Sequence, residues 1–378
     1  MKYILFHTIY INMGGSQTHD IGDFDIVLND PFTLAGQCIE GSINVFIMKA
    51  IRLTRLTYVF KGEEMAEIDK SKSQGLLLDL LEIAADKKSP SKEFSECIYS
   101  ICNDQSDIPF AKENLLEGKY SLPFNIPTRT SYPSSYFENK RGITGRISYN
   151  LSVEAQVNSS DIITKKVLVQ IMQKPTTTVT IRSEIKDLRN FCFFKKGTST
   201  VQCEINSCHI SPYDQLKVCA RCHSSNKEIP QRVYARLVRS FALNISRNHS
   251  YSHRELLPSI KLNNSESINY YSGSINLSSL THVFTQGKCV SNSYSLEVYF
   301  DYPWRYTHSL SLPINVSHKG SVSVNWKPSA EINIPPEDDK ETPKPKTELK
   351  YAPSNVDVAR QSYYELIVLQ HQHLMGRI

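Results

Sequence analysis

A strict alternation of apolar and polar residues distinguishes the segment from Ile147 to Val157. The apolar members are Ile147, Tyr149, Leu151, Val153, Ala155 and Val157, and polar residues fill the positions between them. Because successive side chains of a β-strand point to opposite faces, this pattern predicts an antiparallel strand with one face in a core and the other in water. Just before it, Pro123 and Pro127 lack an N–H donor, so the strand that carries them is expected to turn or to lie at a sheet edge.

The same two-residue period recurs elsewhere in the first half of the chain, at residues 24–28, 43–47 and 56–60. Gly36 and Gly41 lie at the start of the second run, and glycine adopts backbone angles that other residues resist, so residues 32–47 are predicted to form a β-hairpin. Residues 65–107 are predicted to form an excursion that interrupts this series of antiparallel strands. Its centre, residues 76–88, is densely apolar with Ile83 as its one β-branched residue, which favours a short helix or a mobile excursion. Strand character resumes at residues 94–101.

Lys174 and Pro175 begin a predicted hinge, and alternating runs return after it. They include Val201, Cys203 and Ile205, then residues 216–222, 294–299 and 310–316. These runs predict a second set of antiparallel strands. After Trp326 the chain becomes Pro-rich and charged, so residues 327–355 cannot bury enough apolar surface to order themselves. Residues 356–378 have apolar residues near helical spacing, which favours a helix that orders on a partner.

A set of residues between Gly118 and Leu151 resembles the N-terminal domain of arrestins, and most closely the α-arrestins (arrestin-domain-containing and thioredoxin-interacting proteins). The set consists of Gly118, Tyr120, Pro123, Phe124, Ile126, Pro127, Pro133, Ser134, Gly142, Ile147, Tyr149 and Leu151. The alternating run at residues 56–60, followed by Gly62 and Glu64, also resembles a strand of the α-arrestins. Tyr213, Leu216, Val218 and Asn226 match the first strand of the C-terminal domain, although Asp214-Gln215 replaces the Gly-Glu of the family. The resemblance covers roughly residues 24–316.

This resemblance implies an all-β fold of two tandem arrestin-like, immunoglobulin-type β-sandwiches with a flexible C-terminal tail. The expected divisions are an N-terminal extension (1–18), an N-terminal domain (19–173, with the insertion-like excursion at 65–107), a C-terminal domain (174–326), a disordered linker (327–355) and a short helix or sorting motif (356–378). A length of 378 residues suits two domains of about 150 residues and a tail.

Composition narrows the class of protein further. The net charge of +5 is mild and the basic residues are scattered, so no nucleic acid partner is expected. Nine cysteines without regular spacing indicate a reduced cytosolic chain. No apolar run reaches the ~18 residues of a membrane span. Residues 1–11 imitate a signal peptide poorly and are expected to form a disordered or strand-adding extension. Translation from Met13 would instead place Gly14 in a myristoylation pattern.

Cys219, Cys222 and His223 form a C-x-x-C-H motif, which would allow a metal- or haem-binding redox protein as an alternative of another class. Alternation around the motif predicts a strand instead, with the two sulfurs on opposite faces and Cys222 in the core. No phosphate-binding loop, metalloprotease motif or nucleophile elbow occurs in the sequence. We therefore expect no enzyme activity, no cofactor and no metal.

Two groups of residues are candidates for partner binding. The first is a basic surface that could meet phosphorylated tails or anionic lipids, as arrestins do, and it comprises Arg52, Arg55, Lys165, Lys166, Lys195 and Lys196. The second is in the tail, where Tyr363 to Leu366 and Tyr364 to Ile367 each fit the Y-x-x-Φ pattern that clathrin adaptors bind in extended form. A packed amphipathic helix would explain the same residues.

The resemblance implies a non-catalytic adaptor or scaffold that links membrane receptor or transporter cargo to endocytic and trafficking machinery. Cytoplasmic regions of membrane proteins and clathrin adaptors are the expected partners. Ubiquitin-ligase machinery is another, although the tail lacks the PPxY motif that α-arrestins usually carry: Pro335-Pro336 is followed by Glu337-Asp338. The expected location is cytoplasmic, with peripheral association at the plasma membrane or endosomes. A retromer-type coat scaffold of the same fold is the alternative within this class.

Overall fold

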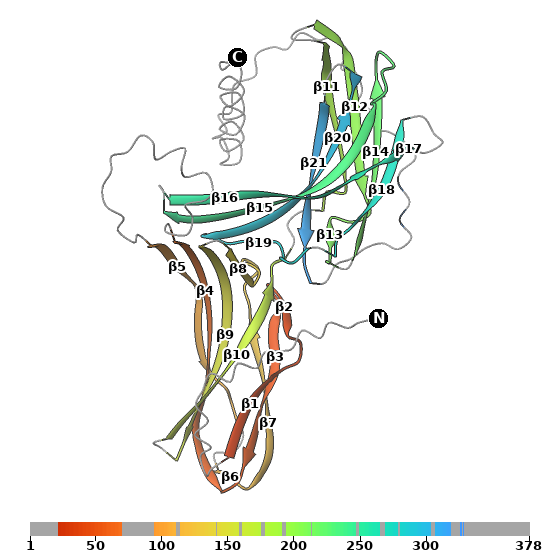
Figure 1. Ribbon diagram of the computed structural model, residues 1–378. Coiled ribbons are helices and arrows are strands. Elements are labelled where there is room, and N and C mark those ends of the chain that lie inside the picture. Colours follow the sequence, from red (N-terminus) through yellow and green to blue (C-terminus); the bar gives the residue numbers. More distant parts are fainter. Residues whose placement is uncertain are drawn as a thin grey trace, which may run out of the picture. The chain divides into compact units, whose positions relative to one another are not determined.

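The computed structural model describes residues 22–69, 94–110, 114–140, 142–158, 161–174, 178–190, 194–212, 214–246, 249–264, 269–278, 280–303, 307–318, 326 and 328 (Figure 1). Within these residues the secondary structure is β-strand and no α-helix occurs, so the all-β prediction is confirmed. It follows that no described helix could cross a lipid bilayer. All of the described residues belong to one compact unit.

Two sheets share a first hydrophobic core, and we call them together the first sandwich. The smaller sheet has the order β1 (Gly22–Leu28), β3 (Cys38–Ile47), β7 (Gly118–Pro127). The larger has the order β2 (Phe32–Leu34), β10 (Asp161–Met172), β9 (Ile143–Val157), β4 (Ile51–Asp69), β5 (Phe94–Asp107), with β6 (Asn114–Leu115) on β4 and β8 (Tyr136–Lys140) on β9. Apolar side chains from both sheets, such as Ile43 and Leu151, meet in the core.

Strand β9 has the two faces that its sequence predicts. The side chains from Ile147 to Val157 at alternate positions are at most 3% exposed, whereas Glu154 is exposed. The strand pairs antiparallel with both β10 and β4, so it is central in its sheet. Pro123 and Pro127 lie on β7, an edge strand that pairs with β3 alone, as their missing N–H groups require.

Two predictions for the first half of the chain were wrong. Residues 32–47 do not form a hairpin: β2 pairs in parallel with β10 of the larger sheet, whereas β3 pairs with β1 and β7 in the smaller sheet. Gly36, with a φ of 90°, lies in the turn between β2 and β3. The excursion at 65–107 is shorter than predicted, because β4 continues to Asp69 and β5 begins at Phe94, where the two strands pair. Residues 76–88 lie outside the described residues.

A second pair of sheets, the second sandwich, encloses a separate core. One sheet has the order β11 (Ile181–Asn190), β12 (Phe194–Ile205), β14 (Gln215–Ser224), β18 (Tyr270–Asn276), β17 (Asn263–Asn264). The other has the order β13 (His209–Ile210), β21 (Thr307–Val316), β20 (Val290–Asp301), β15 (Arg232–Ser246), β16 (His249–Lys261), with β19 (Thr285–Gln286) on β20. Leu216, Leu237 and Leu312 are among the residues of this core.

The Cys219–His223 segment is a strand, as predicted. Cys222 belongs to the core of the second sandwich together with Val218 and Ala220. Cys219 is buried on the opposite face of β14, where it interacts with Tyr270 and Arg221. No three His, Cys, Asp or Glu side chains among the described residues lie close enough together to hold a metal ion.

Strands β15 and β20 contribute to both cores, and this feature places the candidate site. The first half of β15 carries Val233 and Leu237 into the second core, whereas Phe241 and Leu243 at its other end belong to the first core. On β20, Val290 lies in the first core and Leu296 in the second. On the strand face that carries these apolar groups, the polar residue Arg239 separates them on β15 and Asn292 separates them on β20.

Candidate functional site

Arg239 lies where β15 passes from one core to the other. It shares a strand face with Leu237 and Phe241, since these residues are two positions away on either side. The register places it opposite Glu255 on β16 and Tyr294 on β20. Its side chain is 6% exposed, so its charge needs partners that replace water.

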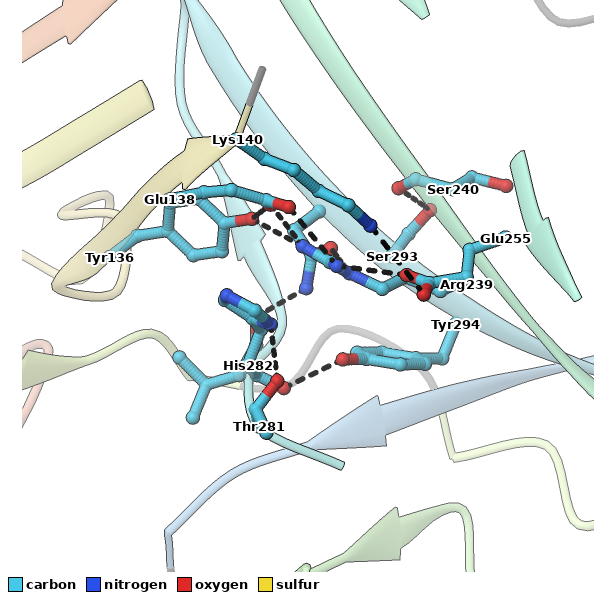
Figure 2. A network of polar contacts seen from close by, with 12 residues as sticks. Tyr136, Glu138, Lys140, Arg239, Ser240, Glu255, Thr281, His282, Ser293 and Tyr294 are labelled. Atoms are coloured by element: carbon cyan, nitrogen blue, oxygen red, sulfur yellow. Dashed lines mark hydrogen bonds and ion pairs between the residues drawn. The ribbon is translucent and has the colours of Figure 1, made fainter. Parts of the chain in front are cut away.

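Those partners come from both sandwiches (Figure 2). From β8 of the first sandwich, the hydroxyl of Tyr136 accepts a hydrogen bond from Arg239 Nη2 at 2.7 Å, and Glu138 forms an ion pair with the guanidinium. From the second sandwich, Glu255 Oε2 accepts from Nη1 at 3.1 Å and Asn292 Oδ1 accepts from Nε at 2.7 Å. The Glu138 side chain is 9% exposed, so the pair joins the two sandwiches in a nearly dry environment.

Aromatic rings enclose this ion pair. The ring of Tyr136 stacks on Phe241 with centroids 5.9 Å apart and lies 5.6 Å from the His282 ring. Tyr294 donates a hydrogen bond from its hydroxyl to the carbonyl oxygen of His282 at 2.8 Å. Thr281 Oγ1 lies 2.7 Å from His282 Nδ1. These rings exclude water from the ion pair, and the lower local dielectric constant strengthens the electrostatic interactions of Arg239 and Glu138.

The network shifts the pKa values of its members. Burial alone would raise the pKa of Glu138, but hydrogen bonds from Tyr136 and Arg239 and the guanidinium charge outweigh it, so the pKa is lowered. Burial, with hydrogen bonding to Glu138, raises the pKa of Tyr136 against the opposing charge of Arg239. Burial and then the charge of Arg239 lower the pKa of His282, against the attraction of Glu138 and Glu255. At neutral pH the site therefore holds an ionised Glu138 and a neutral His282.

A cavity of about 390 Å³ lies beside the ion pair. Its lining includes Phe137, Lys140, Glu255, Leu257, Leu280 and His282, so it combines charged and apolar side chains. Lys140 Nζ lies 3.9 Å from Glu255 Oε1, and both side chains keep contact with solvent. A cavity of this size can take an amino-acid side chain or a small polar group. Because residues of both sandwiches line it, an occupant would contact both.

Glu64 makes a second junction between the sandwiches. Its carboxylate, 1% exposed, accepts hydrogen bonds from the backbone N–H groups of Lys288, Cys289 and Val290 at 2.5 to 3.0 Å. Gly287 lies against this carboxylate, and a Cβ there would come within 2.1 Å of Glu64 Oε1. Glu64 is one of the residues that carry the α-arrestin resemblance, and here it anchors a loop of the second sandwich.

The Pro133-Ser134 pair of the same resemblance also lies at the junction. The carbonyl oxygen of Pro133 accepts a hydrogen bond from the Tyr149 hydroxyl at 2.8 Å. The carbonyl oxygen of Ser134 accepts one from Thr285 of the second sandwich at 3.1 Å. The loop before β8 thus leads directly into the strand that carries Tyr136 and Glu138.

The six basic residues predicted as a surface do not come together in one place. Arg52 and Arg55 are exposed on β4, and Arg55 pairs with Asp107 at 2.9 Å. Lys165 and Lys166 lie on β10, two strands away, and Lys165 pairs with Asp23 at 3.1 Å. The remaining two are on β12 of the second sandwich, and they are Lys195 and Lys196. The tail residues Tyr363, Tyr364, Leu366 and Ile367 lie outside the described residues.

Neither Arg239 nor Glu138 was predicted as a site residue, although Arg239 leaves a signal in the sequence. The positions 233, 235, 237, 239, 241 and 243 form one alternating set that is apolar except for Arg239. A single arginine on an apolar strand face predicts a buried charge with a partner. Glu138 itself carried no such signal, because it lies in a strand of five residues, Tyr136–Lys140, which is too short to establish an alternating pattern.

Comparison with known proteins assigns no family to this chain. No protein-family model matches it, and no curated protein matches it at a significant level. The resemblance to α-arrestins therefore rests on the residues of the sequence itself, between Phe24 and Val316.

Proposed function

We propose that the chain is a non-catalytic, arrestin-like adaptor that links cytoplasmic parts of membrane receptors or transporters to endocytic and trafficking machinery. In this proposal the two sandwiches are tandem arrestin-like domains that together form the cargo platform. The protein would act in the cytoplasm, with peripheral association at the plasma membrane or endosomes. Exposed basic residues such as Arg52 and Lys166 would contribute attraction to phosphorylated or lipid groups.

The observation that carries the proposal is the polar junction at Arg239. Apolar packing stabilises a permanent domain interface without a desolvation cost, whereas a buried ion pair recovers that cost only in good geometry. The Arg239–Glu138 pair closes the junction while the cavity beside it leaves room for a competing group. A binding protein whose two halves respond to an occupant can use such a junction, since small changes there reorient whole domains.

The tail supplies the proposed contact with trafficking proteins. Tyr363 with Leu366, and Tyr364 with Ile367, offer the tyrosine and the bulky apolar residue that clathrin-adaptor pockets accept. The linker of residues 327–355 is rich in Pro and charge, which suits a tether that lets the motif reach a partner.

A pull-down with full-length chain tests this role. The double substitution Tyr363→Ala with Tyr364→Ala should lower the amount of clathrin-adaptor subunit recovered and leave the thermal unfolding midpoint unchanged. Tyr351→Ala is the matched control, because Tyr351 lies in the linker and has Ser354 in place of the apolar residue. Equal recovery with the double variant, or an equal loss with Tyr351→Ala, would contradict the assignment of the tail.

A further inference from the structure

Two cysteine sulfurs from different sandwiches lie in contact. Cys97 Sγ and Cys289 Sγ are 3.2 Å apart, although 192 positions separate them in the chain. Cys97 lies on β5 of the first sandwich and is half-buried. Cys289 directly precedes β20 of the second sandwich and is buried. Both are free thiols in this structure.

Contacts on both sides of Cys289 hold the loop that carries it. Glu64 accepts the backbone N–H of Cys289 at 2.7 Å, and Asn244 donates its N–H to the Cys289 carbonyl oxygen at 2.7 Å. Tyr99, on the same face of β5 as Cys97, packs under Lys288, whose Nζ is 3.7 Å from the ring centroid. The loop that carries Cys289 is thus fixed from both sides of the sulfur.

We propose that Cys97 and Cys289 form an oxidative modification site, in which a low-molecular-weight disulfide converts the two thiols into a disulfide that joins the sandwiches covalently. A disulfide has an S–S length of about 2.05 Å, so the sulfurs must approach by roughly 1 Å from their present contact. Such a movement lies within the reach of side-chain rotation. Nine cysteines without regular spacing are consistent with thiols that are reduced by default.

The exchange proceeds in two balanced steps. The thiolate of Cys97, formed by loss of its proton to solvent, attacks one sulfur of the small disulfide RSSR; the S–S bond of RSSR breaks, and RS⁻ leaves and takes a proton. The sulfur of Cys289 then attacks Cys97 Sγ in the mixed disulfide, and the second RS⁻ leaves with the proton of Cys289. The two cysteines lose two electrons and two protons, which appear as two molecules of RSH.

The order of attack follows from exposure. Burial, and then the hydrogen bond with Cys97 and the charge of Glu64, raise the pKa of Cys289 to about 12. Cys289 is therefore a thiol at neutral pH and is shielded from solvent. Cys97 has the greater access to a small oxidant and is the residue that attacks first.

Peptide mapping of the full-length chain tests the site. The folded protein is incubated with oxidised glutathione, its remaining thiols are alkylated, and it is digested with trypsin without reduction. We expect a linked pair of peptides, residues 93–112 with residues 289–305, and fragmentation should place the bond at Cys97 rather than at Cys102 in the same peptide. The link should disappear after dithiothreitol, and non-reducing electrophoresis should show faster migration of the oxidised chain.

Three variants sharpen the result. Cys97→Ser and Cys289→Ser should each abolish the linked pair, whereas Cys38→Ser, which changes an exposed cysteine on β3, should retain it. The wild-type map stands by itself if Cys289→Ser does not fold. A link through Cys102, or no linked pair under conditions that fully glutathionylate Cys38, would overturn the proposal.

Discussion

Arg239 and Glu138 form an ion pair that joins the two sandwiches, and more than nine-tenths of each side chain is shielded from solvent. The two residues come from β15 and β8, 101 positions apart in the chain. Because both groups are removed from water, either charge would be strongly destabilising without the other as its counter-ion.

Removal of one partner should therefore destabilise the protein strongly. Arg239→Met leaves Glu138 buried without its counter-ion, and we expect the free energy of unfolding to fall by about 3–5 kcal/mol. Adding Glu138→Leu removes the orphaned carboxylate and should recover much of that loss. Urea unfolding of the two single variants and the double variant measures the coupling in a double-mutant cycle.

Arg232→Ala is the matched control on the same strand. Arg232 pairs with Asp301 at 2.7 Å but is 62% exposed, so its removal should leave the unfolding midpoint almost unchanged. Additive single effects for Arg239 and Glu138 would show that the pair does not couple the sandwiches.

Glu64 should be needed to hold the loop of residues 287–290. Glu64→Ala leaves three N–H groups without their acceptor, those of Cys289 and Val290 buried and that of Lys288 partly buried. Each unsatisfied group costs about 1–3 kcal/mol, less where water enters the space. We expect a loss of stability of roughly 3 kcal/mol and faster hydrogen exchange at the amides of Lys288, Cys289 and Val290. Glu63→Ala, at the neighbouring exposed position, serves as the control. Unchanged exchange at those three amides would contradict the anchoring role.

His308 should make the protein less stable in acid. It is fully buried, neither ring nitrogen has a hydrogen-bond partner within the described residues, and burial and then the charge of Lys186 lower its pKa to about 4, against the attraction of Glu184. The unfolded state, with a pKa near 6.5, binds a proton first as pH falls. Stability present above pH 6.5 is thus lost towards pH 4, by roughly 2–3 kcal/mol.

His308→Leu tests that assignment. Unfolding measured between pH 7 and pH 4 should show a flatter stability curve for this variant, and higher stability at pH 4. His223→Leu changes an exposed histidine on β14 and should leave the curve as in the parent. If His308→Leu has the parent's slope, another buried group is responsible for the acid loss.

The face of β9 can be checked with two adjacent substitutions. Val153 is 3% exposed, so Val153→Asp buries a carboxylate without a partner and should cost at least about 3 kcal/mol. Ser152, which points to the other face, should tolerate Ser152→Asp with a small change. Thermal unfolding compares the two, and similar melting temperatures would mean that the two faces are not as described.

The predictable part of this fold is the part that local pattern controls. Alternation from Ile147 to Val157 is sufficient to identify a half-buried strand, and the prolines at 123 and 127 indicate an edge. The partner of β2 was not predictable in this way. Strand β2 has three residues, which are too few for an alternating pattern to indicate its partner strand. Its pairing with β10, about 140 positions later, and not with β3, depends on the tertiary fold.

The junction at Arg239 could not be predicted from the sequence for a similar reason. Arg239 can be recognised as a charge on an apolar face, but nothing local connects it to Glu138. Cys97 and Cys289 are likewise separated by most of the described chain, and their contact exists only once both sandwiches are formed. Sequence patterns report the faces of strands, whereas long-range partners depend on topology.

Proximity labelling of the full-length chain in its native cell tests the adaptor proposal most directly. The comparison uses the wild-type chain, the Tyr363→Ala with Tyr364→Ala variant and the labelling enzyme alone. The proposal predicts that wild type enriches both membrane receptors or transporters and clathrin-adaptor subunits, and that the double variant loses the adaptor subunits but keeps the membrane proteins. Enrichment of neither class over the enzyme alone would contradict the adaptor role.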